Sequence, residues 1–379
     1  MTSLPSPSPD AQDERRFAAV YRVRASAGTI EARAGAIALE QSVELPLAAV
    51  RDARVRDEVV GRVDGIVPAG DGAFDVTIAL ATETTGGEAG QLINMLFGNA
   101  SLLDDVALVD VRLPAAFARG FGGPRHGIAG LRARCGALAR PLTCSALKPQ
   151  GLSPEDFAAL AGSLARAGID VIKDDHGLAD QASAPFEARV RAVQRAVAAA
   201  NRARGATTLY APNLTGDYAT MQRRAAFARD EGVGMLMLAP MVSGVASLAA
   251  LAQDAGVPIL AHPALAGVAR IAAPALLGTL FRLFGADATI FPNFAGRFGY
   301  TRDTCRALAD AARGPLHGLL PALPVPAGGM TLARVAEMRA FFGDDAMLLI
   351  GGDLLMAREG LGARCRAFVD AVAAPVEVA

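Results

Sequence analysis

The sequence predicts an α/β protein in which a C-terminal (β/α)8 barrel follows a smaller ferredoxin-like α+β domain. Two observations support the barrel. Eight short apolar segments alternate with helical stretches over roughly 240 residues, which is the size and rhythm of this fold. The chain also contains 40 glycines and no tryptophan, a composition that suits helices packed closely on a parallel sheet. An open doubly wound sheet fits less well, because it usually has five or six strands.

The barrel strands are expected at regular intervals in the C-terminal two thirds of the chain. They cover residues 142–148, 170–175, 208–213, 235–239, 258–262, 288–291, 321–325 and 347–350. Helical spacing is clear between them, for example at 154–167 and 187–202. Ser153 and Pro154 are the residue types favoured at the N-cap and first position of a helix.

The N-terminal part has a different pattern. Its segments, in chain order, predict strand, helix, strand, strand, helix and strand at residues 18–24, 29–42, 59–67, 73–80, 90–96 and 106–113. This is the order of a ferredoxin-like domain. The Pro/Ser-rich start and a glycine-rich segment mark the boundaries. We therefore expect a disordered tail at 1–16, the ferredoxin-like domain at 17–119, a linker at 120–130 and the barrel at 131–379.

Composition narrows the possible functions. A net charge of −1 and a hydrophobic content of 52% argue against a disordered chain and against a broad nucleic-acid surface. The start of the chain has no apolar signal segment, and the longest uncharged run, 232–253, is interrupted by Pro240 and Gly244. The four cysteines have no CxxC spacing, so reduced and mostly buried thiols are expected. We expect a cytoplasmic protein without membrane or nucleic-acid partners.

Two lysines stand out in an arginine-rich chain. Lys148 and Lys173 are the only lysines among 37 Lys+Arg residues, and each ends a predicted barrel strand, where barrel active sites lie. Lysine, unlike arginine, can lose its proton and act as a base or nucleophile, or form a carbamate with CO₂. Strand alternation puts Lys173 and Asp175 on one face. A carbamate beside Asp175 would suit Mg²⁺, and the alternative is a buried Lys–Asp ion pair.

Two histidines also follow predicted strands. His176 comes directly after the second strand and could be a metal ligand, a general base or a capping residue. His262 ends the fifth strand and could be either a site residue or a hydrogen-bonded core histidine.

Paired glycines follow the predicted seventh and eighth strands. They are Gly328, Gly329, Gly351 and Gly352. Backbone N–H groups at such turns can converge on an anion, and barrels commonly bind phosphate at these two strands. Ordinary tight turns are the alternative. Arg297, in a glycine-flanked loop after the sixth strand, could close over the same anion or simply be a solvated loop arginine.

These motifs resemble the RuBisCO large-chain superfamily, and more specifically its RuBisCO-like, form IV branch. Lys148 is similar to a lysine that transfers protons at the substrate. Lys173, Asp174 and Asp175 resemble the motif whose lysine is carbamylated and binds Mg²⁺ together with the second aspartate. His262 resembles the histidine after the fifth strand of that family.

The resemblance extends to the rest of the chain. Glu40 and Asn99 are similar to residues that reach into the active site of the partner subunit, which implies a homodimer with shared active sites. Arg297 lies near the place of a mobile-loop lysine. The four paired glycines match those around one phosphate of the substrate.

Four positions depart from the carboxylase pattern. His176 stands where a carboxylase has a glutamate as third metal ligand, and Gln150 replaces a second lysine. Pro263 and Ala266 replace an arginine and a histidine that help to hold the second phosphate of a bisphosphate. These departures argue against carboxylation of ribulose bisphosphate and favour a monophosphorylated keto-sugar or keto-sugar acid.

The resulting expectation is decarboxylation, or transcarboxylation and hydrolysis, through a metal-stabilised enolate, as in the branch resembling oxo-isoapionate phosphate decarboxylases and transcarboxylase/hydrolases. Two alternatives remain: isomerisation or enolisation of a methylthio-pentulose phosphate, and a non-catalytic sensor of a phosphorylated ligand. The expected catalytic residues are Lys148, Lys173, His176 and His262. The expected ligands of Mg²⁺ are carbamylated Lys173, Asp175 and His176.

Overall fold

The computed structural model describes residues 14–375, and the chain divides into two compact units. The first unit runs to Phe121 and also contains residues 269–275. The second unit contains, among the described residues, 122–268 and 276–375. The sequence patterns gave no sign that 269–275 would return to the first unit, where Ile271 forms an isolated parallel bridge with Leu108.

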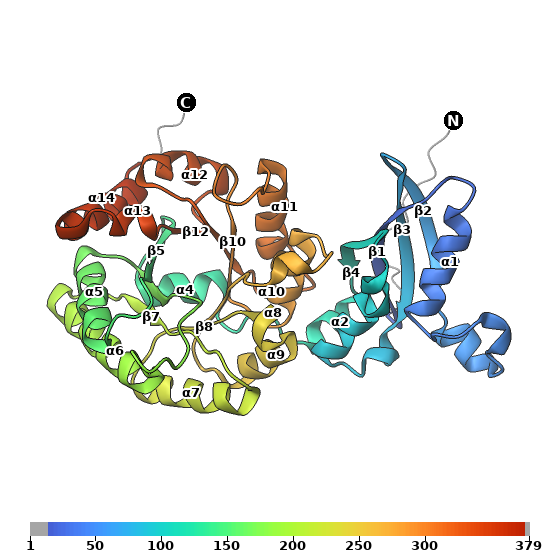
Figure 1. The fold of residues 1–379 in the computed structure, drawn as a ribbon, viewed down its shortest axis with the longest axis horizontal. Helices are drawn as coiled ribbons and strands as arrows, with labels where there is room; N and C mark the ends of the chain where they lie inside the picture. The colour runs from blue at the N-terminus through green and yellow to red at the C-terminus, as the bar shows by residue number, and fades with distance from the viewer. Residues whose placement is uncertain (1–13, 376–379) are drawn as a thin grey trace. The chain divides into compact units, whose positions relative to one another are not determined.

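The first unit has the ferredoxin-like fold that the sequence predicts. Its antiparallel sheet has the strand order β2-β3-β1-β4 (Figure 1). The strands are β1 (Arg16–Arg24), β2 (Arg62–Gly70), β3 (Ala73–Ala81) and β4 (Val106–Arg112). The helices are α1 (Ile30–Glu40), α2 (Ala89–Phe97) and α3 (Ala115–Gly120).

Residues 1–13 of the expected disordered tail at 1–16 lie outside the described residues. The prediction of a disordered tail is wrong at Arg16. Arg16 begins β1 and is 8% exposed. Its guanidinium donates to the carbonyls of Val60 at 3.0 Å, Ala79 at 3.3 Å and Glu58 at 2.7 Å. The charge is buried because backbone oxygens from distant segments surround it, which a local sequence pattern does not reveal.

The second unit is the predicted barrel. Among its described residues, two runs of four parallel strands, β12-β5-β6-β7 and β8-β9-β10-β11, form the wall. An isolated bridge between Asn213 and Met237 joins the β7 and β8 segments, and β11 lies against β12, so the ring closes (Figure 1). The strands are β5 (Leu142–Leu147), β6 (Val171–Asp174), β7 (Leu209–Ala211), β8 (Leu236–Leu238), β9 (Ile259–Ala261), β10 (Ala288–Pro292), β11 (Leu323–Ala327) and β12 (Met347–Leu349).

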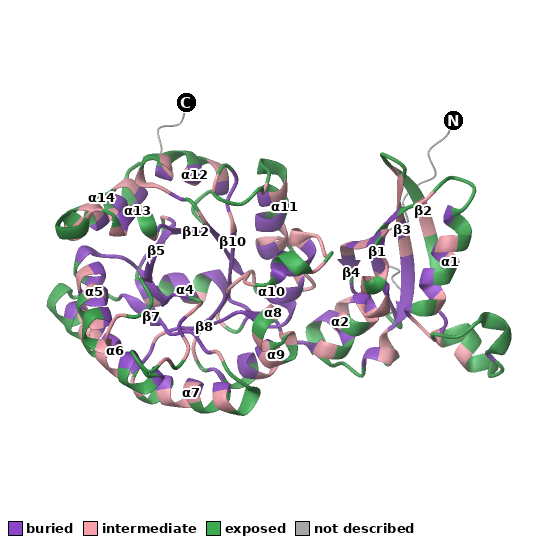
Figure 2. Cartoon of the chain, in the orientation of Figure 1, coloured by how far each residue is buried: buried purple, intermediate pink, exposed green. Residues whose placement is uncertain are grey.

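Helices surround this ring, and their buried residues face the strands (Figure 2). They are α5 (Pro154–Ala167), α6 (Phe186–Arg204), α7 (Tyr218–Asp230), α8 (Pro240–Ser243), α9 (Val245–Asp254), α10 (Phe281–Leu283), α11 (Arg302–Arg313), α12 (Val335–Phe342), α13 (Gly352–Leu355) and α14 (Leu361–Ala373). Ser153 caps α5 as predicted, because its side chain accepts a hydrogen bond from the Asp156 N–H.

One further helix, α4 (Gly127–Cys135), belongs to the barrel core. Its apolar residues Ile128, Leu131 and Cys135 share one buried cluster with inward-facing strand residues. The predicted linker at 120–130 is therefore wrong over its last four residues. Glycines suggested a flexible connection there, but Gly127 begins the helix at a φ of 57°, and an added Cβ would lie 2.9 Å from the Pro321 carbonyl oxygen.

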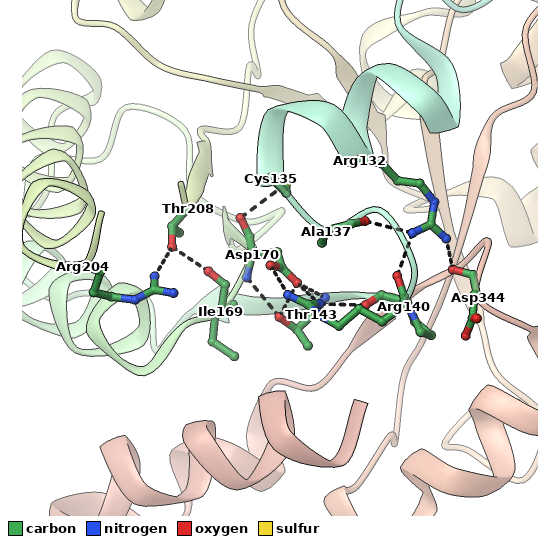
Figure 3. Close-up of polar contacts among 11 residues, drawn as sticks. Arg132, Cys135, Ala137, Arg140, Thr143, Ile169, Asp170, Arg204, Thr208 and Asp344 are labelled. Carbon is green, nitrogen blue, oxygen red and sulfur yellow. Dashed lines mark hydrogen bonds and ion pairs between the residues drawn. The ribbon is translucent and has the colours of Figure 1, made fainter. Parts of the chain in front are cut away.

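A polar cluster lies at the N-terminal ends of β5 and β6, beside α4 (Figure 3). Asp170 accepts both ends of the Arg140 guanidinium, at 2.7 and 2.8 Å, and also the N–H and hydroxyl of Thr143. Arg132 of α4 donates to the carbonyls of Ala137 and Arg140. Side chains at this end of a barrel serve stability, because active sites lie at the opposite end.

Two composition-based expectations can be compared with the structure. All four cysteines are free and buried, as predicted. Between residues 14 and 375, no helix is both long and apolar enough to cross a membrane.

Asp287 offers a test of how α4 is held in the barrel. Its carboxylate is 1% exposed and accepts the backbone N–H groups of His126 and Gly127 at 2.7 Å and of Ile259 at 2.8 Å. Asp287→Ala would leave two buried and one partly buried backbone donor unpaired, so we expect the free energy of unfolding to fall by about 3 kcal/mol in urea denaturation. Asp303→Ala, at an exposed position, is the control, and equal losses in the two variants would contradict this role.

Candidate active site

Four polar side chains meet at the C-terminal ends of three barrel strands. Lys148 follows β5, Asp175 and His176 follow β6, and His262 follows β9. The Lys148 Nζ lies 3.0 Å from Asp175 Oδ2, and the His176 Nδ1 lies 2.8 Å from Asp175 Oδ1. The rings of His176 and His262 stack with centroids 4.3 Å apart and planes 10° apart. Asp175 is therefore the centre of the cluster.

Strand alternation explains which side chains of β6 reach this cluster. Val171 belongs to the buried core cluster of the barrel, so Lys173 and Asp175 share its inward face. Asp174 points the other way, towards Arg189 of α6 and Tyr210 of β7. The two neighbouring aspartates thus have different surroundings.

Lys173 is buried beside the cluster. It is 3% exposed, and its Nζ donates to the carbonyl of Asp174 at 2.8 Å. Burial lowers the pKa of the Lys173 amine, although nearby Cys144 and Asp175 act in the opposite direction. A lowered pKa increases the neutral fraction of the amine, which is the form that acts as a base or reacts with CO₂.

Asp175 stays ionised although it is only 7% exposed. Burial alone would raise its pKa, but the contacts with His176 and Lys148 outweigh burial and hold the pKa well below its usual range. The His176 contact is short but poorly directed, since Oδ1 receives no hydrogen bond of regular geometry. One oxygen of this buried carboxylate is therefore available to a further donor or a cation.

His262 is neutral in this environment. Burial, together with nearby Lys173 and His176, lowers its pKa to about 2. Its Nδ1 accepts the backbone N–H of Ala264 at 3.1 Å, which assigns the ring proton to Nε2. His262 can therefore donate a hydrogen bond from Nε2 without carrying a positive charge.

The two glycine turns differ in backbone conformation and in the space that a Cβ atom would have. Gly328 and Gly329 have φ values of 79° and 106°, which favour glycine. The loop after β10 packs directly on them: Arg297 N–H donates to the Gly328 carbonyl at 2.9 Å, and a Cβ on Gly296 would lie 2.2 Å from that oxygen. Backbone conformation and packing both require glycine at this first turn, and the phosphate-binding role of Gly328 and Gly329 stays a prediction.

Gly351 and Gly352 are different, because a Cβ at either position would meet open space. Asp353, the next residue, ties the two turns together: its Oδ2 accepts the Leu332 N–H at 3.1 Å. An anion could approach the second turn, so the phosphate site stays a prediction that rests mainly on Gly351 and Gly352.

Three further predicted site residues have local contacts of their own. Arg297 is exposed, and its guanidinium lies 5.4 Å from the centre of the Phe298 ring. Glu40 and Asn99 belong to the first unit, where Asn99 Nδ2 donates to Glu40 Oε1 at 2.8 Å. The structure thus brings these two residues together as a pair.

Sequence reasoning gave no role to two buried residues that contact the loop after β6. Arg189 donates to the carbonyls of Ala179 and Ala184, and Asn213 donates to those of His176 and Leu178. An arginine on the apolar face of the following helix was the available signal, since a buried arginine needs several acceptors.

Residues 127–377 match the family model for the ribulose bisphosphate carboxylase large chain, catalytic domain. The chain belongs to the RuBisCO large-chain family. It is 55% identical over 359 residues to ribulose bisphosphate carboxylase-like protein 1 of Rhodopseudomonas palustris, covering 94% of this chain and 98% of that protein. It is 54% identical over 360 residues to the 5-methylthioribulose-1-phosphate isomerase of Rhodospirillum rubrum, covering 94% of this chain and 96% of that protein.

A solved structure agrees with this membership. The crystal structure of a Rubisco-like protein from Rhodopseudomonas palustris matches with a TM-score of 0.89 and 51% identity, covering 95% of this chain and 98% of that one. The predicted resemblance to RuBisCO-like proteins and the predicted barrel with its N-terminal domain are confirmed.

A family metal site can be compared with the residues present. Within the described range 14–375, no group of three or more His, Cys, Asp or Glu side chains could hold a metal ion. Asp175 and His176 supply two such side chains, so a metal at this position depends on a further ligand. Lys173 could supply it only as a carbamate, because an ammonium or an amine that donates to Asp174 provides no oxygen ligand.

The lowered pKa of His262 predicts how stability depends on pH. Below its ordinary pKa of 6.5 the unfolded chain binds a proton at this histidine, whereas the folded chain does not until about pH 2. Stability is therefore lost as pH falls from 6.5. Between pH 7.5 and 5.0 we expect the wild type to lose about 2 kcal/mol more than His262→Asn in urea denaturation. Equal pH dependence in both proteins would show that His262 titrates normally.

Proposed function

We propose that this RuBisCO-like chain is an isomerase of a 5-methylthio-pentulose phosphate. The observation that carries the proposal is the cluster of Lys148, His176 and neutral His262 around the ionised Asp175. The relative from Rhodospirillum rubrum, which matches over nearly the whole chain, carries an isomerase name. These findings favour the isomerase alternative over decarboxylation or transcarboxylation and hydrolysis, and over a non-catalytic sensor.

Isomerisation of a ketose phosphate requires three functions from the site. A base removes a proton from a carbon next to the ketone, and the resulting enediolate must be stabilised at its oxygen. The proton then returns to a different carbon, which relocates the carbonyl group without loss of atoms. The phosphate must also be anchored so that the reacting carbons stay near the base.

Lys148 and His176 are suited to proton transfer. Their side chains are 39% and 47% exposed, so both can reach a bound substrate, and each contacts one oxygen of Asp175. Lys148 is our choice for the proton-transferring residue, with His176 as a second general acid or base. His262 donates from Nε2 to the developing oxyanion, because a neutral imidazole is a better matched donor there than one that carries a charge.

The substrate phosphate would bind at the turn of Gly351 and Gly352, where the backbone is open to a ligand. Arg297, on the adjoining loop after β10, would close over it. In a homodimer, the Glu40–Asn99 pair of the partner subunit would complete each site, as the family resemblance implies.

Mg²⁺ would be held by carbamylated Lys173 and Asp175, with His176 beside them. The Asp175 Oδ1, which receives no hydrogen bond of regular geometry, and the lowered pKa of Lys173 both fit this arrangement. The ion would supply positive charge next to the enediolate oxygen. The imidazole of His176 is a poor ligand for Mg²⁺, so the carbamate is needed to make a site of oxygen ligands.

The activity can be tested with 5-methylthioribulose 1-phosphate in D₂O. We expect an isomeric ketose phosphate and incorporation of deuterium at carbons next to the ketone, followed by NMR and mass spectrometry. A 3-oxo sugar-acid phosphate, assayed in parallel, should release no CO₂. Absence of both isomer and deuterium exchange, with Mg²⁺ and bicarbonate present, would rule out the proposed reaction.

The proposed roles predict the effect of two substitutions. Lys148→Arg keeps the charge but removes a titratable amine, and His176→Asn removes the imidazole, so we expect kcat/KM to fall by about 100-fold or more in each. His317→Asn is the matched control, since His317 lies in the loop before β11 at a φ of 48°, which asparagine tolerates. Full activity in both site variants would show that neither residue transfers the proton.

The metal proposal predicts that binding depends on CO₂. Mn²⁺ can replace Mg²⁺ as a probe, with electron paramagnetic resonance reporting bound ion independently of activity. We expect binding by the wild type in bicarbonate buffer, at least tenfold weaker binding in CO₂-free buffer, and none by Lys173→Arg. Wild-type binding that is unaffected by CO₂ removal would contradict a carbamate ligand, and this comparison requires no variant to fold.

A further inference from the structure

A fully buried ion pair lies on the outer side of β6, behind the active site. Asp174 and Arg189 have side chains that are 0% exposed, and Arg189 Nε lies 3.2 Å from Asp174 Oδ2. Removing two charges from water costs several kcal/mol per ion, so a buried pair is weak evidence for stability alone. The other contacts of the pair indicate what it does.

Arg189 holds the middle and the end of the loop that joins β6 to α6. Its Nη1 donates to the carbonyl of Ala184 at 2.7 Å and its Nη2 donates to that of Ala179 at 2.9 Å. The planar guanidinium directs three donors at three acceptors, an arrangement that the single ammonium of a lysine cannot reproduce. The loop therefore depends on the shape of this side chain as well as on its charge.

Asn213 holds the beginning of the same loop. Its backbone N–H donates to Asp174 Oδ2 at 3.1 Å, and its Nδ2 donates to the carbonyls of His176 at 3.0 Å and Leu178 at 2.7 Å. Tyr210 of β7 donates to the other Asp174 oxygen at 2.8 Å. Asp174 thus collects donors from α6, from β7 and from the residue that binds the His176 backbone.

We propose that Asp174, Arg189 and Asn213 form a positioning network that fixes His176 against Asp175 for proton transfer. Arg189 contacts none of the reacting groups, and it acts through the loop carbonyls. The inference rests on the proposed isomerase function for its kinetic consequence, but the placement of His176 can be measured without substrate.

The test compares two buried arginines that each donate to two or more backbone carbonyls. Arg189→Lys is the test variant and Arg282→Lys is the control. Arg282 is 1% exposed and donates to the carbonyls of Leu319, Leu320 and Gly314, all in the segment before β11. Similar losses of stability are expected in both variants, so stability cannot distinguish them.

Imidazole NMR of ¹⁵N-histidine-labelled protein gives the readout. We expect Arg189→Lys to shift the His176 imidazole resonances at a fixed pH, and to lower kcat by about tenfold or more with KM changed less than threefold. Arg282→Lys should change none of these. An unaltered His176 signal in Arg189→Lys, or the same alteration in Arg282→Lys, would overturn the proposal.

A second variant covers the case in which Arg189→Lys does not fold. Asn213→Ala removes the donors to the His176 and Leu178 carbonyls and leaves the Asp174–Arg189 pair in place, so it should shift the His176 signal in the same way. If it does not, the network does not position His176. A protein that shows the NMR shifts but isomerises no methylthio-pentulose phosphate would keep the positioning role and reject the proposed reaction.

Discussion

The site depends on a single ionised carboxylate in a confined space. Asp175 faces Lys148 and His176, with Lys173 and His262 close by, and it is the only acidic side chain in that group. Without its charge, the amine of Lys148 would lose the carboxylate oxygen that lies 3.0 Å away. Asp175 is held ionised while neighbouring His262 stays neutral, and this difference between neighbouring groups makes acid–base chemistry possible.

Side chains on the two faces of β6, the second strand of the barrel, have different roles. Asp174 and Asp175 are adjacent in sequence, yet one lies against α6 and the other faces the interior. The outward aspartate collects structural donors, which leaves the inward one available for the chemistry. This division follows directly from the two-residue period of a β-strand, so a shift of one residue in register would exchange the two roles.

The rhythm of strands and helices was readable from the sequence because buried parallel strands are short apolar runs with clear boundaries. The strand end that carries Lys173 and Asp175 was readable for the same reason. Residues whose partners are distant in sequence were not: Arg16 is buried by carbonyls of other segments, and 269–275 returns to the first unit. The glycine pairs were ambiguous, because a glycine required by packing and one required by a ligand look alike without coordinates.

The position of α4 determines where substrate can enter the barrel and where product can leave it. Its apolar side chains pack with Leu142 and Leu323 in one buried cluster, so the barrel is closed at its N-terminal end. Substrate and product would then enter and leave the candidate site at the C-terminal ends of the strands. A segment that covers this end of the barrel would control both substrate binding and product release. While that segment is closed, a reaction intermediate could not leave the site.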